Sequence, residues 1–455
     1  MAASHPNVLL VHCHDLGQYL GCYGVDVETP RIDELANEGA LFENHFVTAP
    51  QCSPSRGSLL TGRYPHINGL MGLAHGNWEL DEGERILPQY LSDAGYETHL
   101  FGLQHVTGDT DRLGFDHVHS EGNLYPGVSP EVHQVNRARN VSDVVATFLE
   151  KEAYDAPFFA SVGFFECHRV EEENGRFGFD ADFYDSDDPD EVRPLPYLPD
   201  RRGIRRDLGE FRGMVSALDD GVGTILDALA AADLESETIV VFTTEHGIAF
   251  PRAKGSPYDA GIEAVLLVRW PGVVDDGVRY DELVSNVDVL PTLLECLDID
   301  VPDDLNGRSF HPLLVDDGYD ERDRVFAEMT WHDMYNPVRA IRTDRYKYVR
   351  NLWHLPTVYL STDIFASEAG REVRESYGVP LRPAEELYDL EADPQESDNV
   401  VYEPGYQDVR IDLSRQLREW METTDDPLLD GPVPPADYDE ITTWPHEEEA
   451  TGEPG

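Results

Sequence analysis

The segment QCSPSRGSLLTGRYPH (residues 51–66) places a single cysteine, Cys52, four residues before Arg56. A buried structural cysteine needs no arginine beside it. A zinc site would need a second cysteine or histidine close by, and the next histidine is His66. The guanidinium of Arg56 is a planar fork of donors, suited to holding an oxyanion or to polarising a group on residue 52. The pattern therefore indicates a chemical role for Cys52.

Two acid–histidine pairs lie far from Cys52 in the sequence but follow apolar runs of the same kind. His14-Asp15 comes after NVLLVHC, and Glu245-His246 comes after TIVVFTT. Carboxylate and imidazole ligands together can hold a divalent cation. We expect a metal site formed by His14, Asp15, Cys52, Glu245 and His246.

Further histidines and one lysine are candidates for proton transfer and charge stabilisation. His105 and His168 follow two other apolar runs, and imidazole is suited to general acid–base chemistry near neutral pH. Lys254 is one of only three lysines in the chain, with Lys151 and Lys347. A cation, an arginine, a lysine and histidines around one nucleophile favour a tetrahedral oxyanion as substrate.

Alternating apolar and amphipathic segments predict the elements that position these residues. Buried strands are expected at 7–13, 98–102, 157–165, 238–244 and 264–270, and helices at 29–40, 86–95, 141–151 and 210–232. This alternation predicts an α/β fold with a large, mostly parallel mixed sheet flanked by helices. Functional residues of such folds lie beyond the carboxyl ends of the strands. Four of the predicted strands are followed there by a histidine.

The pattern changes after about residue 320, and we divide the chain into three parts. Residues 1–320 form the predicted catalytic domain. Residues 321–425 form a smaller C-terminal α+β subdomain with antiparallel strands at 325–331, 338–344 and 345–351, a long irregular region and a helix near 407–423. Residues 426–455 are an acidic, Pro-rich tail that is expected to be extended or disordered.

The charge of the chain is far from balanced. It has 89 acidic and 34 basic residues and a formal net charge of -55. Such a surface repels itself unless salt screens it, which predicts a salt-rich cytoplasm. It also disfavours nucleic acid and anionic membranes as partners. The five cysteines are irregularly spaced, and no signal or membrane-spanning segment is recognised, so we expect a soluble cytoplasmic protein.

CSPSRGSLLTG resembles the signature of the sulfatase family, in which Cys-x-Pro-Ser-Arg directs oxidation of the cysteine to formylglycine. The segments NVLLVHCHDLGQYLGCYG, FTTEHGIAFPRAKG and ELYDLEADPQESDNV resemble the two metal-binding strands and the C-terminal block of that family. GLQHV, FFECHR, HGIAFP and YNPVRAIRTDRYKYVRNL are most similar to its heparan N-sulfatase (sulfamidase) branch. The resemblance extends over about residues 6 to 400.

The resemblance implies an alkaline-phosphatase-like fold and hydrolysis of a sulfate ester or sulfamate, possibly on a sugar. Residue 52 would be formylglycine, made by a formylglycine-generating enzyme, and one divalent metal would be bound. Arg56 would orient residue 52, Lys254 would stabilise charge on the sulfate, His168 would protonate the leaving group and His105 would contact the sulfate or the nucleophile. The substrate would be a small sulfated or sulfamated compound.

The chain departs from the family pattern in two places. His14 and His246 stand where carboxylate or amide ligands are usual, which moves the expected metal from calcium toward manganese or zinc. Leu103 replaces the lysine of Gly-Lys-x-His. Gln104 could replace its hydrogen bond, and His75, His332 and Asp333 are further candidates for substrate contacts. Two alternatives remain open: a phosphodiesterase or phosphonate monoester hydrolase, and a catalytically silent binding protein. The sequence does not predict the oligomeric state.

Overall fold

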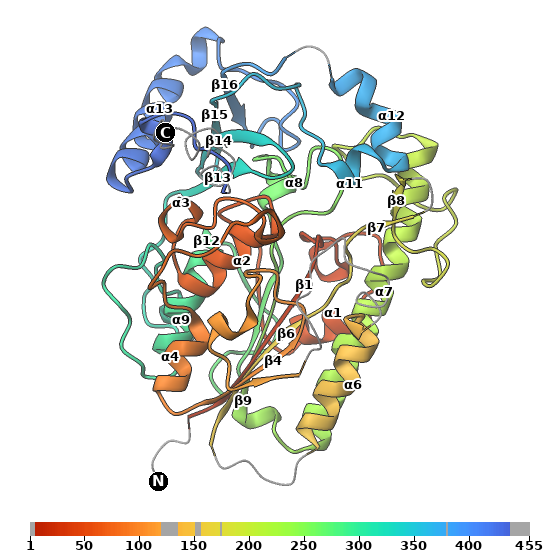
Figure 1. The fold of residues 1–455 in the computed structure, drawn as a ribbon, viewed down its shortest axis with the longest axis vertical. Coiled ribbons are helices and arrows are strands. Elements are labelled where there is room, and N and C mark those ends of the chain that lie inside the picture. Colours follow the sequence, from red (N-terminus) through yellow and green to blue (C-terminus); the bar gives the residue numbers. More distant parts are fainter. Residues whose placement is uncertain (1–4, 120–134, 151–155, 173–174, 379–380, 437–455) are drawn as a thin grey trace, which may run out of the picture.

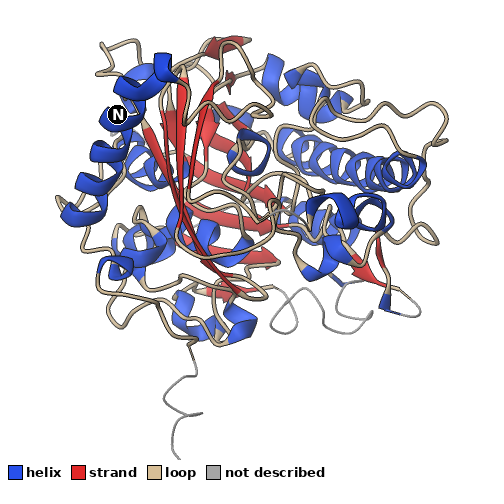
Figure 2. Cartoon of the chain, turned by 90° about the horizontal axis from the view of Figure 1, so that it is seen from above, coloured by secondary structure: helices blue, strands red, loops and turns tan. Residues whose placement is uncertain are grey.

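The computed structural model describes residues 5–119, 135–150, 156–172, 175–378 and 381–436 (Figure 1). A twisted sheet of eight strands runs through the molecule with helices on both faces, as Figure 2 shows from above. Its strands, in spatial order, are β11 (Val278–Tyr280), β2 (Ala40–Phe42), β10 (Leu266–Arg269), β9 (Thr238–Thr244), β1 (Asn7–Cys13), β6 (Phe158–Gly163), β4 (Glu97–Gly102) and β5 (His117–Val118).

The central strands are parallel, with β1 between β6 and β9, and β4 beside β6. Only β10 runs antiparallel to its neighbours β9 and β2. The sheet is therefore mixed and mostly parallel, as predicted. The carboxyl ends of β1, β4, β6 and β9 meet at one edge.

Alternation along β1 explains why both faces of the sheet are covered. Leu9, Val11 and Cys13 are buried in the core that includes α1 (Pro30–Asn37), α6 (Ala138–Leu149) and α7 (Arg202–Ala231). Val8 and Leu10 are buried in the opposite core, with α2 (Cys52–Thr61), α4 (Leu87–Asp93) and α9 (Val289–Cys296). Successive strand residues point to opposite faces, so an uninterrupted apolar strand needs helices on both sides.

A second, antiparallel sheet lies beyond the carboxyl ends of the large one (Figure 1). It consists of β13 (Val325–Trp331), β14 (Tyr335–Arg342), β15 (Tyr346–Asn351) and β16 (Glu385–Asp389), with α13 (Gln407–Thr423) packed on it through Leu413, Leu417 and Trp420. The remaining short elements are β3 (His45–Phe46), β7 (Val170–Glu171), β8 (Phe177–Gly178), β12 (Val284–Ser285), α3 (Pro65–Asn68), α8 (Asp259–Ile262), α10 (His311–Leu314), α11 (Thr362–Phe365) and α12 (Glu368–Tyr377).

Three predictions about these elements are wrong in part. The helix expected over 29–40 ends at Asn37, because Gly39 lies against the backbone of Val268 and residues 40–42 join the sheet as β2. The region expected to be irregular after residue 351 contains α11, α12 and β16, and α12 packs on α7. The helix expected over 210–232 begins eight residues earlier, at Arg202.

The first residues of the predicted tail are folded onto the second sheet. The guanidinium of Arg339 forms a fully buried ion pair with Asp426, and Trp331 Nε1 donates to the carbonyl oxygen of Val433 over 3.0 Å. These contacts correct the expectation of an extended chain for residues 426–433, whereas residues 437–455 lie outside the described residues. Across the described parts of the chain, no helix combines the length and the apolar character needed to cross a membrane.

Candidate active site

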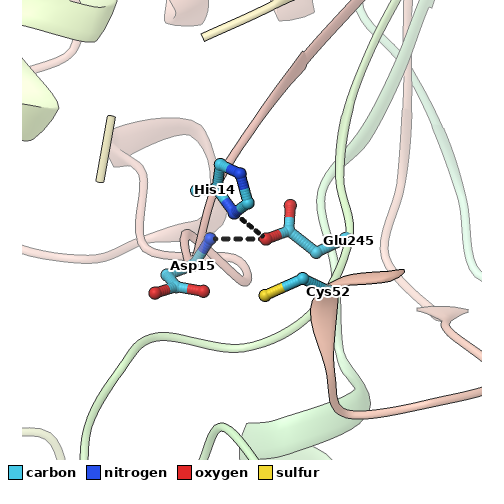
Figure 3. A group of neighbouring side chains, drawn as sticks. All are labelled: His14, Asp15, Cys52 and Glu245. Carbon is cyan, nitrogen blue, oxygen red and sulfur yellow. Dashed lines mark hydrogen bonds and ion pairs between the residues drawn. The ribbon is translucent and has the colours of Figure 1, made fainter. Parts of the chain in front are cut away.

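The carboxyl ends of β1 and β9 bring the two acid–histidine pairs to the first turn of α2. Figure 3 shows His14, Asp15 and Glu245 beside Cys52. One ligand atom each from His14, Asp15, Cys52 and Glu245 lies within 4.8 Å of the others, and all four residues are buried. Nδ1 of His14 lies 2.6 Å from Oε1 of Glu245, which also accepts from the backbone nitrogen of Asp15 at 3.3 Å. The structure thus brings together residues separated by more than 200 positions.

Cys52 is the first residue of α2, and the whole helix is buried. Its Sγ lies 3.4 Å from Nε2 of His246. The amino end of a helix carries a partial positive charge that favours an anion beside it. Burial nevertheless raises the pKa of the Cys52 thiol well above its usual value, so the unmodified side chain is a neutral thiol. Without modification it is a weak nucleophile.

Arg56 lies one turn further along α2 and contacts protein groups around the site. Its Nη2 donates to Oε2 of Glu245 at 2.9 Å and to the carbonyl oxygen of Cys13 at 3.0 Å. Its Nη1 lies 2.6 Å from Nδ1 of His12. Arg56 therefore holds Glu245 and the end of β1 in place. The sequence analysis assigned no role to His12, and only its alternation with His14 along β1 could have indicated one.

Lys254 is buried between two carboxylates. Its Nζ lies 2.9 Å from Oδ2 of Asp15 and 3.0 Å from Oδ2 of Asp363. Burial disfavours the charged form of all three side chains. The charge of Lys254 nevertheless holds the pKa of the Asp15 and Asp363 carboxyls below the usual value, and the two carboxylates raise the pKa of Lys254. Asp363 comes from α11 and was missed by the sequence analysis, because no recognisable motif surrounds it.

His168 lies beside this ion pair, with Nε2 at 3.4 Å from Nζ of Lys254. Its Nδ1 is 2.6 Å from the carbonyl oxygen of Arg169, a contact that requires a proton on Nδ1 and leaves the lone pair on Nε2. Burial, followed by the charge of Lys254, lowers the pKa of His168 to about 4. A protonated His168 would therefore be a strong acid next to the lysine.

His105 enters the site from the loop after β4. Its Nε2 lies 3.1 Å from Nδ1 of His75, the two rings are stacked, and its ring centroid is 5.8 Å from that of His14. Asp15 and His105 both have positive φ values, +49° and +52°. Non-glycine residues in this region are uncommon and concentrate at functional sites.

The remaining substrate candidates are placed differently. The side-chain amide of Gln104 donates to the carbonyl oxygen of Thr107, and its oxygen accepts from the backbone of Val106 and Thr107. The nitrogen and the oxygen of this amide thus both bond to the backbone of their own loop, which contradicts the substrate contact proposed for Gln104. His332 and Asp333 form an ion pair of 2.8 Å, and Asp333 accepts from the backbone of Thr362, next to Asp363. Asp333 thus supports the start of α11, which carries Asp363.

The donor set fits a divalent cation. Nε2 of His14 and Oδ1 of Asp15 are buried and have no hydrogen-bond partner among the described residues. Nε2 of His246 lies 3.3 Å from that Asp15 oxygen and 3.6 Å from Oε1 of Glu245. Nδ1 of His246 contacts the carbonyl oxygen of Gly247 at 2.8 Å, the outer contact typical of metal-bound histidines. Burial lowers the pKa of His14 and His246, which keeps both imidazoles neutral for binding.

An α/β sheet with a nucleophile candidate, a set of possible metal ligands and a buried lysine at its carboxyl edge is the arrangement expected of a hydrolase that acts on tetrahedral oxyanions. The sequence profile of the Sulfatase family matches residues 6–299, and the profile "N-sulphoglucosamine sulphohydrolase, C-terminal" matches residues 245–363. The chain belongs to the sulfatase family, as the sequence analysis predicted.

The chain is similar to a curated protein of this family, and solved structures share its fold. N-sulphoglucosamine sulphohydrolase of Homo sapiens is 30% identical over 470 residues, covering 94% of this chain and 92% of that protein. A structure solved for work on the metabolism of multiple glycosaminoglycans by Bacteroides thetaiotaomicron is similar with a TM-score of 0.74 and 22% identity, covering 95% of this chain and 100% of the other. The phosphonate monoester hydrolase of Agrobacterium radiobacter shares the fold, with a TM-score of 0.70, 20% identity and coverage of 92% and 96%.

Proposed function

We propose that the protein is a metal-dependent hydrolase of a sulfate ester or sulfamate, with residue 52 as the nucleophile after oxidation to formylglycine. One observation carries the proposal. Cys52 lies at the amino end of α2, within 4.8 Å of ligand atoms of His14, Asp15 and Glu245, with Lys254 bonded to Asp15. The nucleophile, the metal ligands and a cation for the sulfate thus share one buried site.

The chemistry explains why residue 52 needs modification. A neutral thiol is a poor nucleophile, and a thiolate would form a stable thiosulfate ester with sulfur. Oxidised to formylglycine, residue 52 would supply an aldehyde hydrate: one hydroxyl would attack sulfur, and the other, once deprotonated, would expel sulfate as the aldehyde re-forms. The S–O or S–N bond of the substrate breaks in the first of these steps, and the leaving group needs a proton.

The surrounding residues have roles that follow from their positions. Nε2 of His168 carries the lone pair in the neutral ring, so His168 would give the leaving group its proton from the protonated form, which its pKa of about 4 makes a strong acid beside Lys254. Lys254 stabilises negative charge on the sulfate oxygens from a position fixed by Asp15 and Asp363. His105, stacked on His75, contacts the sulfate or the hydrated aldehyde. Arg56 keeps Glu245 charged and aligned with the metal ligands.

His14, Asp15, Glu245 and His246 would hold the metal. The ion supplies Lewis-acid stabilisation of the sulfate oxygens. Two imidazoles favour manganese or zinc over calcium. Cys52 is only 2% exposed, so a terminal sulfate or sulfamate group on a small molecule, including a sugar, suits the site. The match of residues 245–363 to the sulphohydrolase C-terminal profile, a range that begins at Glu245 and ends at Asp363, supports the sulfamate.

A second candidate is phosphoester hydrolysis. The phosphonate monoester hydrolase of Agrobacterium radiobacter has the same fold, and histidine metal ligands suit such an enzyme. A third candidate, a silent binding protein, is favoured by Leu103, which removes a positive charge expected at the sulfate.

The first experiment is peptide mass spectrometry across Cys52, followed by parallel rate measurements on N-sulfoglucosamine, an aryl sulfate and a phosphate diester. We expect a peptide lighter than the cysteine form, with sulfate or sulfamate hydrolysis much faster than diester hydrolysis. Cys52→Ala should abolish turnover and leave the fold intact. An unmodified cysteine in folded, metal-loaded protein would favour the silent protein, and preferential diester cleavage would favour the phosphodiesterase.

We also propose that the protein works in a high-salt cytoplasm. Its net charge of -55 supports this, because the Debye length falls from about 10 Å at 0.1 M salt to about 3 Å at 1 M. The midpoint of thermal unfolding should therefore rise when potassium chloride increases from 0.1 to 2 M. A midpoint that is unchanged or falls over this range contradicts the proposal.

A further inference from the structure

A second group of residues that can bind a metal lies on β4 and β5, the last two strands at one lateral edge of the large sheet. Glu97 and His99 are on β4, and His117 is on β5 with His119 just after it. Residues two apart on a strand point to the same face. β4 and β5 are parallel, and His99 is paired in register with His117. The Glu-x-His and His-x-His patterns therefore place one carboxylate and three imidazoles on one face of two adjacent strands.

The distances between these groups are close to those between the ligands of one metal ion. One ligand atom each from Glu97, His99 and His117 lies within 4.8 Å of the other two. Nε2 of His117 is 2.7 Å and Nε2 of His99 is 3.8 Å from Oε1 of Glu97. Ligands at about 2.0–2.1 Å from a tetrahedral zinc ion are roughly 3.3 Å from each other. A shift of about half an ångström in each of the two contacts with Glu97 would bring them to this spacing.

His119 gives this group an outer contact. Its Nε2 lies 3.0 Å from Nδ1 of His99. If Nδ1 of His99 donates this hydrogen bond, Nε2 of His99 carries the lone pair on the side of Glu97. Metal-bound histidines are usually oriented in this way by a partner on the second ring nitrogen.

Burial fixes one ligand and leaves the others accessible. His99 is 1% exposed, and its ring centroid lies 4.5 Å from that of Phe148 on α6. The side chains of Glu97 and His117 are 36% and 48% exposed. An ion can thus reach the group from solvent and bind against a ring that is already held in place.

We propose that Glu97, His99 and His117 bind a divalent transition-metal ion, zinc by ligand type, with water in the fourth position. His119 is a positioning residue. This site is distinct from the one at the carboxyl ends of the strands. Since β5 has only two residues, an ion shared by β4 and β5 would fasten this edge of the sheet, a structural role.

The test is zinc binding by the full chain after removal of metals with a chelator, measured by equilibrium dialysis and elemental analysis. His117→Ala and Glu97→Gln change half-exposed side chains and should each lose one bound zinc per chain relative to wild type. His119→Ala should weaken binding of that ion about 10-fold. His311→Ala is the matched control, because His311 faces a single carboxylate, Glu295, at 3.7 Å and should bind zinc as wild type does.

Thermal unfolding gives a second, independent readout. Zinc should raise the unfolding temperature of wild type and His311→Ala more than that of His117→Ala, because an ion that binds only the folded state stabilises it. The proposal is overturned if His117→Ala and Glu97→Gln bind as many zinc ions as wild type with the same affinity. Turnover in the same samples reports separately on the site at Cys52.

Discussion

The ammonium group of Lys254 lies 3.0 Å from the carboxylate of Asp363, which is 109 residues further along the chain. Lys254 follows β9 of the large sheet, whereas Asp363 lies on α11, after three strands of the antiparallel sheet. A charge at the candidate active site is thus positioned by the C-terminal part of the chain. The large sheet and the C-terminal part of the chain therefore both contribute residues to this site.

Lys254 has a matched control in the same protein, since Lys347 is also buried between two carboxylates, Asp259 and Glu396. Lys254→Gln and Lys347→Gln should both lower the unfolding temperature. Only Lys254→Gln should also reduce kcat, by on the order of 10²-fold, because it removes charge stabilisation at the sulfate. Comparable losses of kcat in the two variants would show that Lys254 acts only on stability.

Arg56→Met should destabilise the fold as well as abolish activity. It leaves the buried carboxylate of Glu245 without its cation, and breaking a buried pair costs about 3–5 kcal/mol. Urea unfolding measures this loss. The control is Arg415→Met, which breaks only exposed, solvent-screened pairs with Asp412 and Glu419 and should change stability far less. Equal unfolding midpoints for the two variants would contradict the role given to Arg56.

The metal preference of the candidate active site should follow its imidazoles. Removing metal with a chelator should abolish turnover, and manganese or zinc should restore it better than calcium. Replacing His14 by aspartate adds an oxygen ligand and should shift the ratio of reactivation toward calcium. Reactivation of wild type by calcium alone would show that the two histidines do not determine the metal.

The carboxyl group of Glu263, which is not one of the metal ligands, should make the stability of the fold depend on pH. Burial, and then the charge of Asp259, raises the pKa of Glu263 to about 8. The folded state keeps this proton up to about pH 8, whereas the unfolded state loses it near pH 4.3. The free energy of unfolding of wild type should therefore fall as pH rises between these values.

Glu263→Gln should remove this contribution, so its stability relative to wild type should increase with pH up to about 8 and then remain constant. Denaturant unfolding at pH 5, 6.5, 8 and 9 measures the difference. A constant difference over this range would show that the carboxyl titrates alike in both states.

The sequence predicted the features that depend on local pattern. The apolar strands 7–13 and 238–244 gave the parallel core and placed His14-Asp15 and Glu245-His246 at one edge, because strand polarity determines where such residues lie. Asp363 could not be predicted, because its place beside Lys254 depends on the packing of α11 on α12 and of α12 on α7. Gln104 was misassigned, since the sequence does not show that an amide bonds to its own loop.

All ten residues of α2, from Cys52 to Thr61, are buried. With Cys52 only 2% exposed and α2 packed against α9, an oxidising enzyme would not be expected to reach this thiol in the folded chain. If residue 52 is oxidised as proposed, oxidation would have to precede the packing of α2, and the unfolded chain would be the substrate of the maturation enzyme. Protein folded in a host without that enzyme would be trapped in the thiol form, and later exposure to the enzyme should restore activity only after the chain has been unfolded.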